Sequence, residues 1–248
     1  MSAGAVLILG GTAEARELAR ELDDAGLPVI SSLAGRVARP RLPPGEVRIG
    51  GFGGSEALAG WLHDHDIVAV VDATHPFAER ISGSAAAACP RAGVPLLRLE
   101  RPGWTERPGD RWRWVDDLQE AAAAVPQLGE RIFLTTGRQG LGAFADIDLA
   151  WFLIRCVDPP DPPLPGHHEL ILDRGPYTLS GELDLIDRHR IDAIVTKDSG
   201  GRHTEAKLYA ARERGLPVIV VRRPARPPAP AVATVSAAAA WVHELAGA

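Results

Sequence analysis

The sequence has few cysteines and no long apolar run, and each shortage excludes a class of protein. Its 248 residues include two cysteines, Cys89 and Cys156, which lie without C-x-x-C spacing or an evident set of metal ligands. Neither a disulfide framework nor a metal site is therefore expected. No apolar stretch approaches the ~18 residues of a membrane span, and no basic region precedes the first apolar run. We expect a cytoplasmic protein with reduced thiols and no membrane contact.

Lysine and excess positive charge are also scarce. The formal net charge is −5 at pH 7, and of the 27 basic residues only Lys197 and Lys207 are lysine. Nucleic-acid binding requires a basic face, so this class of partner is excluded. A general bias toward arginine does not explain why both lysines lie so close together. The apolar fraction of 46% fits one large or two modest globular domains.

The chain opens with an apolar run, residues 6–9, that ends on Gly10-Gly11-Thr12 and continues into helix-forming residues. Four consecutive apolar residues favour a strand buried on both faces of a parallel sheet. The glycines let the backbone approach a ligand, while Thr12 can cap the next helix and reach a phosphate oxygen. The third glycine of G-x-G-x-x-G is missing, and a plain tight connection is the alternative. Its position at the first strand of a β-α-β series favours a pyrophosphate site, with Glu14 beside it.

The second apolar run, residues 27–30, leads into Ser31, Ser32, Gly35 and Arg36. An NAD-binding fold places an Asp or Glu here to hold the ribose hydroxyl, and none is present. Hydroxyl groups, a glycine and a guanidinium instead suit a dianionic 2′-phosphate. This loop therefore predicts a preference for NADP over NAD, the alternative being an ordinary polar loop with solvated arginines.

A glycine cluster occupies residues 50–54. Several glycines around one aromatic residue are costly inside a strand or helix. We expect a loop whose backbone lies against a ligand, with Gly51 and Gly53 in contact with the cofactor.

Polar residues also come directly after the buried strand predicted at residues 67–71, namely Asp72, Thr74 and His75. Ligands of parallel sheets bind just past the carboxyl ends of the strands. His75 could donate to a substrate carboxylate or supply a proton, and a purely structural hydrogen bond is the alternative. These three residues are expected beside cofactor or substrate.

The second half repeats this pattern. A strand at residues 131–134 ends near Thr136 and Gly137, and a strand at residues 191–195 runs into Lys197. Several turns recur at a constant offset of 122, which pairs Thr74 with Thr196. We expect two Rossmann-like parallel-sheet α/β domains facing a shared cleft. They cover residues 1–104 and 115–225, are joined by a crossing at 105–114, and are followed by a helix at 232–248 that packs on one of them.

The two lysines belong to this second half. Lys197 opens a glycine-containing turn and should point toward an anion, whereas Lys207 sits in the first turn of the next helix, where a cation opposes the helix dipole. An electrostatic role is one interpretation of Lys207. The other is a surface pair with Glu205 or Asp198, worth at most about 1 kcal/mol.

Seven motifs together resemble the precorrin-6A reductase family of the cobalamin pathway. They are GGTAEARELA (10–19), SSLAGRV (31–37), RIGGFGG (48–54), DATHPFA (72–78), ERPGW (100–104), TTGRQGL (135–141) and TKDSGGRHTEAKLYAARERGLPV (196–218). The resemblance implies two α/β domains with NADPH between them and hydride transfer to a ring double bond of the precorrin-6A macrocycle, giving precorrin-6B. Neighbouring cobalamin-pathway enzymes are candidate partners, and no metal is implied.

Residues and resemblance together assign the site. The expected catalytic residues are His75, Asp72 and Lys197. The expected cofactor contacts are Gly10, Gly11, Thr12, Glu14, Ser31, Ser32, Gly35, Arg36, Gly51, Gly53, Thr74, Thr136 and Gly137. The expected substrate contacts are Lys197, Ser199, Gly200, Gly201, Thr204 and Lys207. Two other classes share these features, a non-catalytic nucleotide or tetrapyrrole carrier and a tetrapyrrole lyase or cyclase that needs no nicotinamide.

Overall fold

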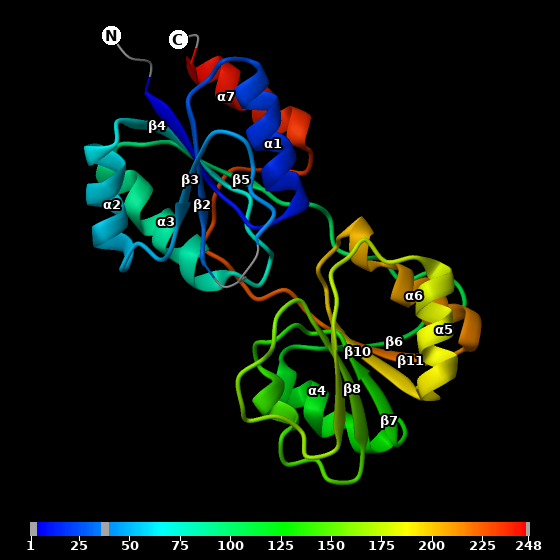
Figure 1. The fold of residues 1–248 in the computed structure, drawn as a ribbon. Coiled ribbons are helices and arrows are strands. Elements are labelled where there is room, and N and C mark those ends of the chain that lie inside the picture. Colours follow the sequence, from blue (N-terminus) through cyan, green and yellow to red (C-terminus); the bar gives the residue numbers. More distant parts are fainter. Residues whose placement is uncertain (1–3, 36–39, 247–248) are drawn as a thin grey trace. The chain divides into compact units, whose positions relative to one another are not determined.

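The chain forms two compact units, each built on one parallel sheet (Figure 1). The computed structural model describes residues 4–35 and 40–246. Unit 1 comprises Met1–Pro102 and Pro224–Ala248, and unit 2 comprises Gly103–Arg223. The prediction of two parallel-sheet α/β domains is confirmed, while their shared cleft stays a prediction.

The sheet of unit 1 has the strand order β12-β5-β4-β1-β2-β3. Its strands are β1 (Ala5–Leu9), β2 (Val29–Leu33), β3 (Glu46–Ile49), β4 (Ile67–Asp72), β5 (Leu96–Leu99) and β12 (Ala231–Val232). Its helices are α1 (Ala13–Asp24), α2 (Ser55–Asp64), α3 (Glu79–Ala92) and α7 (Val235–Ala246).

The sheet of unit 2 has the order β6-β11-β10-β7-β8-β9. Its strands are β6 (Arg111–Val115), β7 (Arg131–Leu134), β8 (Trp151–Cys156), β9 (His168–Leu172), β10 (Ala193–Lys197) and β11 (Pro217–Val221). Its helices are α4 (Leu118–Ala124), α5 (Leu179–His189) and α6 (Ala206–Arg214), with short 3-10 helices η1 (Val125–Gln127), η2 (Leu141–Phe144) and η3 (Arg202–Thr204).

Both sheets reverse their strand order at an equivalent place. In unit 1 the chain moves outward from β1 to β2 and β3, then returns to the other side of β1 with β4 and β5. In unit 2 the reversal lies between β7 and β10. A parallel sheet leaves a crevice outside the carboxyl ends of the strands at such a point. The fold therefore places one candidate ligand edge on each unit.

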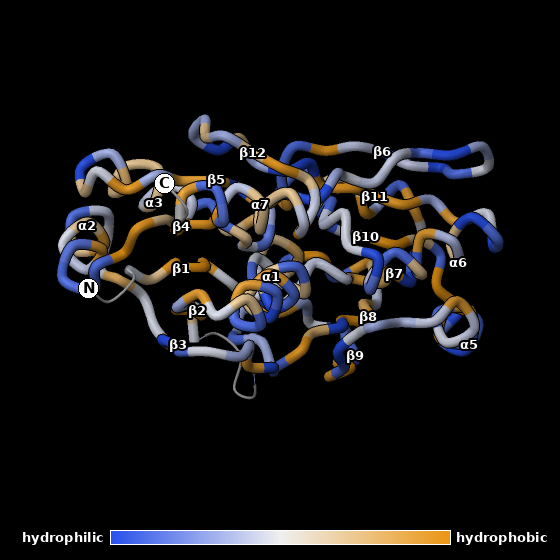
Figure 2. The backbone as a smooth tube through the Cα atoms, turned by 90° about the horizontal axis from the view of Figure 1, so that it is seen from above, coloured by the Kyte–Doolittle hydropathy of each residue, from blue (hydrophilic) through white to orange (hydrophobic). Residues whose placement is uncertain are grey.

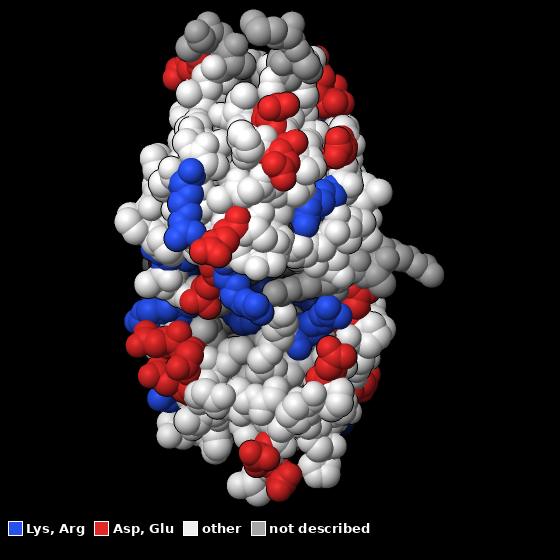
Figure 3. Space-filling model, turned by 90° about the vertical axis from the view of Figure 1, so that its left-hand side faces the viewer, with Lys and Arg blue, Asp and Glu red and all other residues white. Residues whose placement is uncertain are grey.

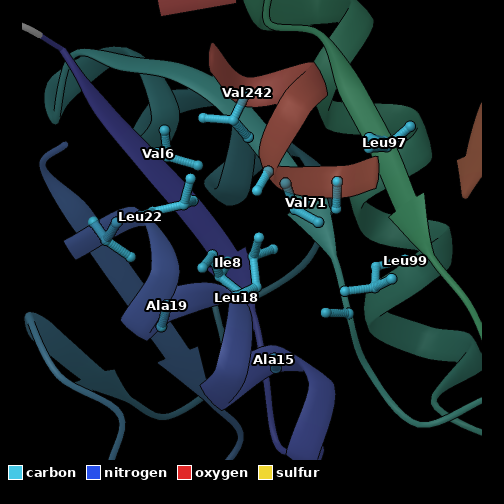
Figure 4. Close-up of a cluster of buried hydrophobic side chains, with 14 of the residues drawn as sticks. Val6, Ile8, Ala15, Leu18, Ala19, Leu22, Val71, Leu97, Leu99 and Val242 are labelled. Carbon is cyan, nitrogen blue, oxygen red and sulfur yellow. The ribbon is translucent and has the colours of Figure 1, made fainter. Parts of the chain in front are cut away.

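Alternating side chains of β1 build the two faces of unit 1. Val6 and Ile8 pack with α1 and α7, whereas Leu7 and Leu9 pack with residues of α2 and α3. Figure 4 shows the first of these clusters, in which Leu18 and Leu22 of α1 and Val242 of α7 converge on Ile8 and its neighbours. Because β1 is buried on both sides, it needs a continuous apolar sequence, as Figure 2 shows for β1, β10 and β11.

The second half of the crossing expected at residues 105–114 lies in a strand, because β6 begins at Arg111. The run Arg111 to Trp114 alternates charged and aromatic residues, which suits an edge strand with one face toward solvent. Trp112 and Trp114 pack against the core cluster on one side of the sheet. Arg111 and Arg113, which alternate with them, are exposed.

The structural equivalence of Thr74 and Thr196, predicted from the offset of 122, is wrong. The register pairs Leu96 with Val70 in unit 1 and Val218 with Ile194 in unit 2, so Thr196 occupies the place of Asp72. The glycine repeat does hold, because Gly93 and Gly215 end α3 and α6 in the left-handed conformation.

Candidate functional site

Two predicted loops meet at the carboxyl edge of unit 1. The Thr12 hydroxyl donates to the Ala73 carbonyl at 2.8 Å, and the Ala73 amide donates to Leu9 O at 3.0 Å. The same hydroxyl accepts from the Ala15 amide at 3.1 Å and caps α1. Its one hydrogen is thus used inside the protein, and the donors that this edge still offers are the backbone amides of the first turn of α1.

A small hollow of about 200 Å³, counted with its opening to solvent, lies at this edge. Glu14 and Arg101 form an ion pair of 2.6 Å at its lining. The remaining lining residues are Thr12, Ala73, Thr74, Pro76, Leu99 and Glu100. The hollow therefore joins the ends of β1, β4 and β5.

Asp72 is 2% exposed and holds Thr74. Its Oδ1 accepts from the Thr74 hydroxyl at 2.6 Å and the Thr74 amide at 3.2 Å. Its Oδ2 lies 3.7 Å from Arg98 Nε and 3.9 Å from Arg226 Nη1. Two guanidinium groups thus compensate a buried carboxylate that acts on the site through Thr74.

His75 is partly exposed in the loop after β4. Its Nδ1 accepts from the Phe77 amide at 3.3 Å, which corresponds to a neutral ring with its hydrogen on Nε2. A ring held in this way presents Nε2 as a hydrogen-bond donor.

The glycine loop before α2 is held by Arg48, which sequence reasoning missed. The guanidinium donates to Gly50 O at 2.6 Å and Gly51 O at 2.8 Å, and lies 3.7 Å from the centroid of the Phe52 ring. An added Cβ at Gly51 would meet nothing within 4 Å, and at Gly53 only the Ala57 methyl. Arg48 therefore holds the loop in place, and space remains beside the backbone of Gly51 and Gly53. The arginine two residues before the glycine cluster was the available signal.

Ser31 and its neighbours lie at the end of β2. Ser31 is 2% exposed, and its Oγ has no hydrogen-bond partner in the described chain. Ser32 O accepts from the Gly10 amide at 2.9 Å, and Gly35 adopts a φ of 71°. Arg36 lies outside the described residues.

In unit 2, Lys197 ends β10 and its ammonium donates to Gln139 O at 3.4 Å. Burial lowers the pKa of Lys197. The neighbouring Thr136 hydroxyl is buried without a partner in the described residues, and Gly137 has a φ of 76°. Only the four-residue η2 comes after this glycine turn, so it lacks the helix that comes after Gly11.

The turn after Lys197 is closed by hydroxyl contacts. Ser199 Oγ lies 3.1 Å from Thr204 Oγ1, which donates to Gly201 O at 3.2 Å. Gly200 adopts a φ of 64°, a conformation that favours glycine. The turn therefore brings together four of the predicted substrate residues.

Lys207 is 2% exposed and supports this turn from inside unit 2. Its ammonium donates to Thr204 O at 2.5 Å and lies 4.7 Å from the centroid of the Trp104 ring. Among the described residues it forms no ion pair, so the surface pair with Glu205 or Asp198 is not observed. Burial, with a smaller contribution from the positive charge of Arg155, lowers the pKa of Lys207 to about 7 against the opposing effect of Glu182 and Glu205.

Sequence reasoning missed the buried pair beside Lys207. Arg155 donates to Glu182 Oε1 at 2.8 Å, and its guanidinium lies 3.6 Å from the centroid of the Tyr177 ring. Glu182 sits in α5 and Arg155 in β8, and no local spacing joins them. Both side chains are at least 95% buried, so the pair fixes α5 on the sheet rather than meeting a ligand.

The surface carries both signs of charge. On the face drawn in Figure 3, Lys and Arg side chains lie among Asp and Glu side chains, and neither sign covers the face alone. On this face, recognition of an anion would therefore depend on individual donors rather than on a broad positive surface. Cys89 and Cys156 are buried thiols whose pKa values burial raises to about 12 and about 11, which keeps both protonated.

No group of three or more metal-ligating side chains occurs in residues 4–35 and 40–246. The helices in these ranges include none that is both long and apolar enough to span a membrane.

Comparisons with known proteins agree over nearly the whole chain. A family model described as "Precorrin-6x reductase CbiJ/CobK" matches residues 5–243. A precorrin-6A reductase of Rhodococcus erythropolis is 55% identical over 97% of this chain and 98% of its own. One of Mycobacterium tuberculosis is 52% identical with the same coverage. A solved structure titled "CobK precorrin-6A reductase" aligns with a TM-score of 0.92 and 43% identity, and covers 98% of this chain and 97% of that one.

The low pKa of Lys207 predicts a pH dependence of stability. The folded state holds the amine near pKa 7, against 10.5 in the unfolded chain, so the unfolded state binds more protons between these values. The free energy of unfolding should therefore rise with pH in this window, by at most about 1.4 kcal/mol per pH unit, relative to Lys207→Met. Urea unfolding of both proteins at about pH 7 and about pH 9 measures this difference. Lys197→Met, at the less buried lysine, is the control and should remove less of the slope, whereas parallel pH profiles for wild type and Lys207→Met would refute the burial argument.

Proposed function

The chain belongs to the precorrin-6x reductase CbiJ/CobK family, and on that premise we propose that it reduces precorrin-6A to precorrin-6B in cobalamin biosynthesis. NADPH, when bound, supplies the hydride that reduces one ring double bond of the macrocycle. The observation that carries the proposal is the carboxyl edge of unit 1, where the Gly10–Thr12 and Asp72–His75 loops meet over a hollow.

The residues of this edge fit a dinucleotide phosphate. Gly11 has a φ of 112°, and an added Cβ there would meet nothing within 4 Å, so a pyrophosphate can approach the backbone at the start of α1. The buried Ser31 hydroxyl lacks a partner among the described residues, and Ser32 and Gly35 lie beside it on the same edge. No carboxylate occurs among residues 31–36, which favours a 2′-phosphate over a free ribose hydroxyl.

The rest of this edge supports the nicotinamide half. Gly51 and Gly53 offer open backbone, and Thr74 lines the hollow with its hydroxyl directed by Asp72. Glu14 is ion-paired with Arg101 at the same hollow. We assign Asp72 a positioning role, because its carboxylate is buried and contacts Thr74 and two arginines.

His75 and the turn after Lys197 are the proposed substrate contacts. Precorrin-6A carries several acetate and propionate carboxylates, and an acidic protein must meet them with local donors. The Nε2–H of His75 is one such donor, and the Lys197 ammonium with the Ser199–Thr204 turn is another. Gly200 and Gly201 give the turn its shape, Lys207 holds it, and Thr136 and Gly137 stay assigned to the cofactor.

The function is tested by mixing the purified protein with precorrin-6A and NADPH and measuring NADPH oxidation together with the mass of the macrocycle. We expect NADPH to be consumed in step with a macrocycle that gains two hydrogens. Binding of both ligands without oxidation would indicate a carrier instead. A changed macrocycle in the absence of NADPH would indicate a lyase or cyclase.

Arg36→Ala tests the preference for NADPH. If its guanidinium contacts the 2′-phosphate, its loss should weaken NADPH binding by about 10- to 100-fold and leave NADH binding nearly unchanged. Isothermal titration with both cofactors measures this ratio. Arg20→Ala, on the exposed side of α1, is the matched control and should change neither affinity. Equal losses for NADPH and NADH in Arg36→Ala would remove this residue from the 2′-phosphate site.

His75→Asn separates a ligand contact from a packing role. A residue that donates from Nε2 to substrate should lose about 10- to 100-fold in kcat/KM on substitution, with an unchanged Tm. His63→Asn, an exposed histidine of α2, is the control for general effects of the change. A lowered Tm with normal kcat/KM would assign His75 to packing alone.

A further inference from the structure

One carboxylate of unit 2 holds both segments through which the chain crosses between the units. These crossings lie at Pro102–Gly103 and Arg223–Pro224. Asp198 Oδ1 accepts from the Trp104 amide at 2.9 Å, and Asp198 Oδ2 lies 3.1 Å from Arg223 Nε. The same Nε donates to Asp198 O at 3.1 Å. The two crossings, 121 residues apart in sequence, thus share one side chain.

The fit around this carboxylate is close. An added Cβ at Gly103 would lie 2.5 Å from Asp198 Oδ2, so the backbone of the first crossing packs directly on it. The Asp198 side chain is 10% exposed, and that of Arg223 is 18% exposed. Because both groups are largely shielded from water, their pairing constrains geometry more than a surface ion pair does.

Asp198 also belongs to the turn proposed to bind substrate. It comes directly after Lys197, precedes Ser199, and donates its amide to Val221 O at 2.9 Å. Trp104, the residue it holds in the first crossing, is contacted on its ring by Lys207, which also binds Thr204 O. Turn and crossings therefore form one continuous set of contacts inside unit 2.

We propose that Asp198 is a positioning residue that couples the Lys197–Thr204 turn to both crossing segments. A change in the turn then alters both segments together, and loosening either segment loosens the turn. The ligand part of this inference rests on the proposed function, since it takes the turn as a substrate contact. The coupling itself rests only on contacts among Asp198, Trp104 and Arg223.

Hydrogen exchange of the full chain, without ligands, tests the coupling. Arg223→Ala removes the second crossing's hold on Asp198 and leaves the Trp104 contact in place. We expect exchange to accelerate about tenfold at residues 199–204 and at the Trp104 amide, which donates to Asp198. Asp198→Asn, which keeps an acceptor for Trp104 but loses the charge, should accelerate the same amides. Faster exchange confined to residues 221–226 in Arg223→Ala would overturn the coupling.

Asp110→Asn is the matched control for loss of stability. Asp110 pairs with Arg212 at 2.8 Å, its side chain is 1% exposed, and it lies in the same unit. This variant should leave exchange at the turn and crossings unchanged even if its Tm falls as far as that of Asp198→Asn. Equal acceleration in both variants would show that Asp198 contributes only general stability.

The activity readout separates this inference from the proposed function. In Asp198→Asn we expect the KM for precorrin-6A to rise about fivefold or more, while the Kd for NADPH, most of whose proposed contacts lie in unit 1, changes less than about twofold. If the variants show the expected faster exchange but the wild type has no reductase activity, the proposed function is wrong and the coupling through Asp198 still holds. Unchanged KM with coupled exchange would overturn the substrate part of the inference.

Discussion

The hydrogen bond from the Thr12 hydroxyl to Ala73 O is the contact on which the site of unit 1 depends. It joins the loop after β1 to the loop after β4, the two strands between which the order of the sheet reverses. The same hydroxyl caps α1, so one side chain fixes both the start of the helix and the position of Thr74 and His75. Parallel pairing forces both loops to one edge, and this bond sets their separation.

The two units share a strand order and differ in the helix that succeeds the first glycine turn. In unit 1 a helix of 12 residues starts after Thr12, and its free amides face the proposed phosphate site. In unit 2 only a short 3-10 helix succeeds Gly137, and the ligand edge instead carries Lys197 and a turn closed by hydroxyl groups. The first arrangement suits a dinucleotide, and the second suits separate carboxylates on a larger ligand.

The sequence predicts the central strands and the loops after them, because a strand buried on both faces needs a continuous apolar run and ends on glycine or polar residues. Edge strands are harder to predict from the sequence. β6 mixes arginine with tryptophan, β12 has only two residues, and β9 is mostly exposed, so none has a clear apolar pattern. Contacts between residues distant in sequence could not be predicted either. The guanidinium groups beside Asp72, for example, come from Arg98 of β5 and from Arg226, which follows unit 2 in the chain. The burial of Lys207 could not be predicted for the same reason, because its ammonium packs on Trp104, a residue distant in sequence.

We propose that this protein delivers hydride from NADPH to precorrin-6A. It is tested most directly with NADPH carrying deuterium at the transferable C4 position, combined with mass spectrometry of the macrocycle. Direct hydride transfer predicts that the product carries deuterium at a ring carbon when one C4 face of the cofactor is labelled. When the other face is labelled, the same ring carbon should carry only hydrogen. A reduced macrocycle without deuterium from either labelled cofactor would contradict it.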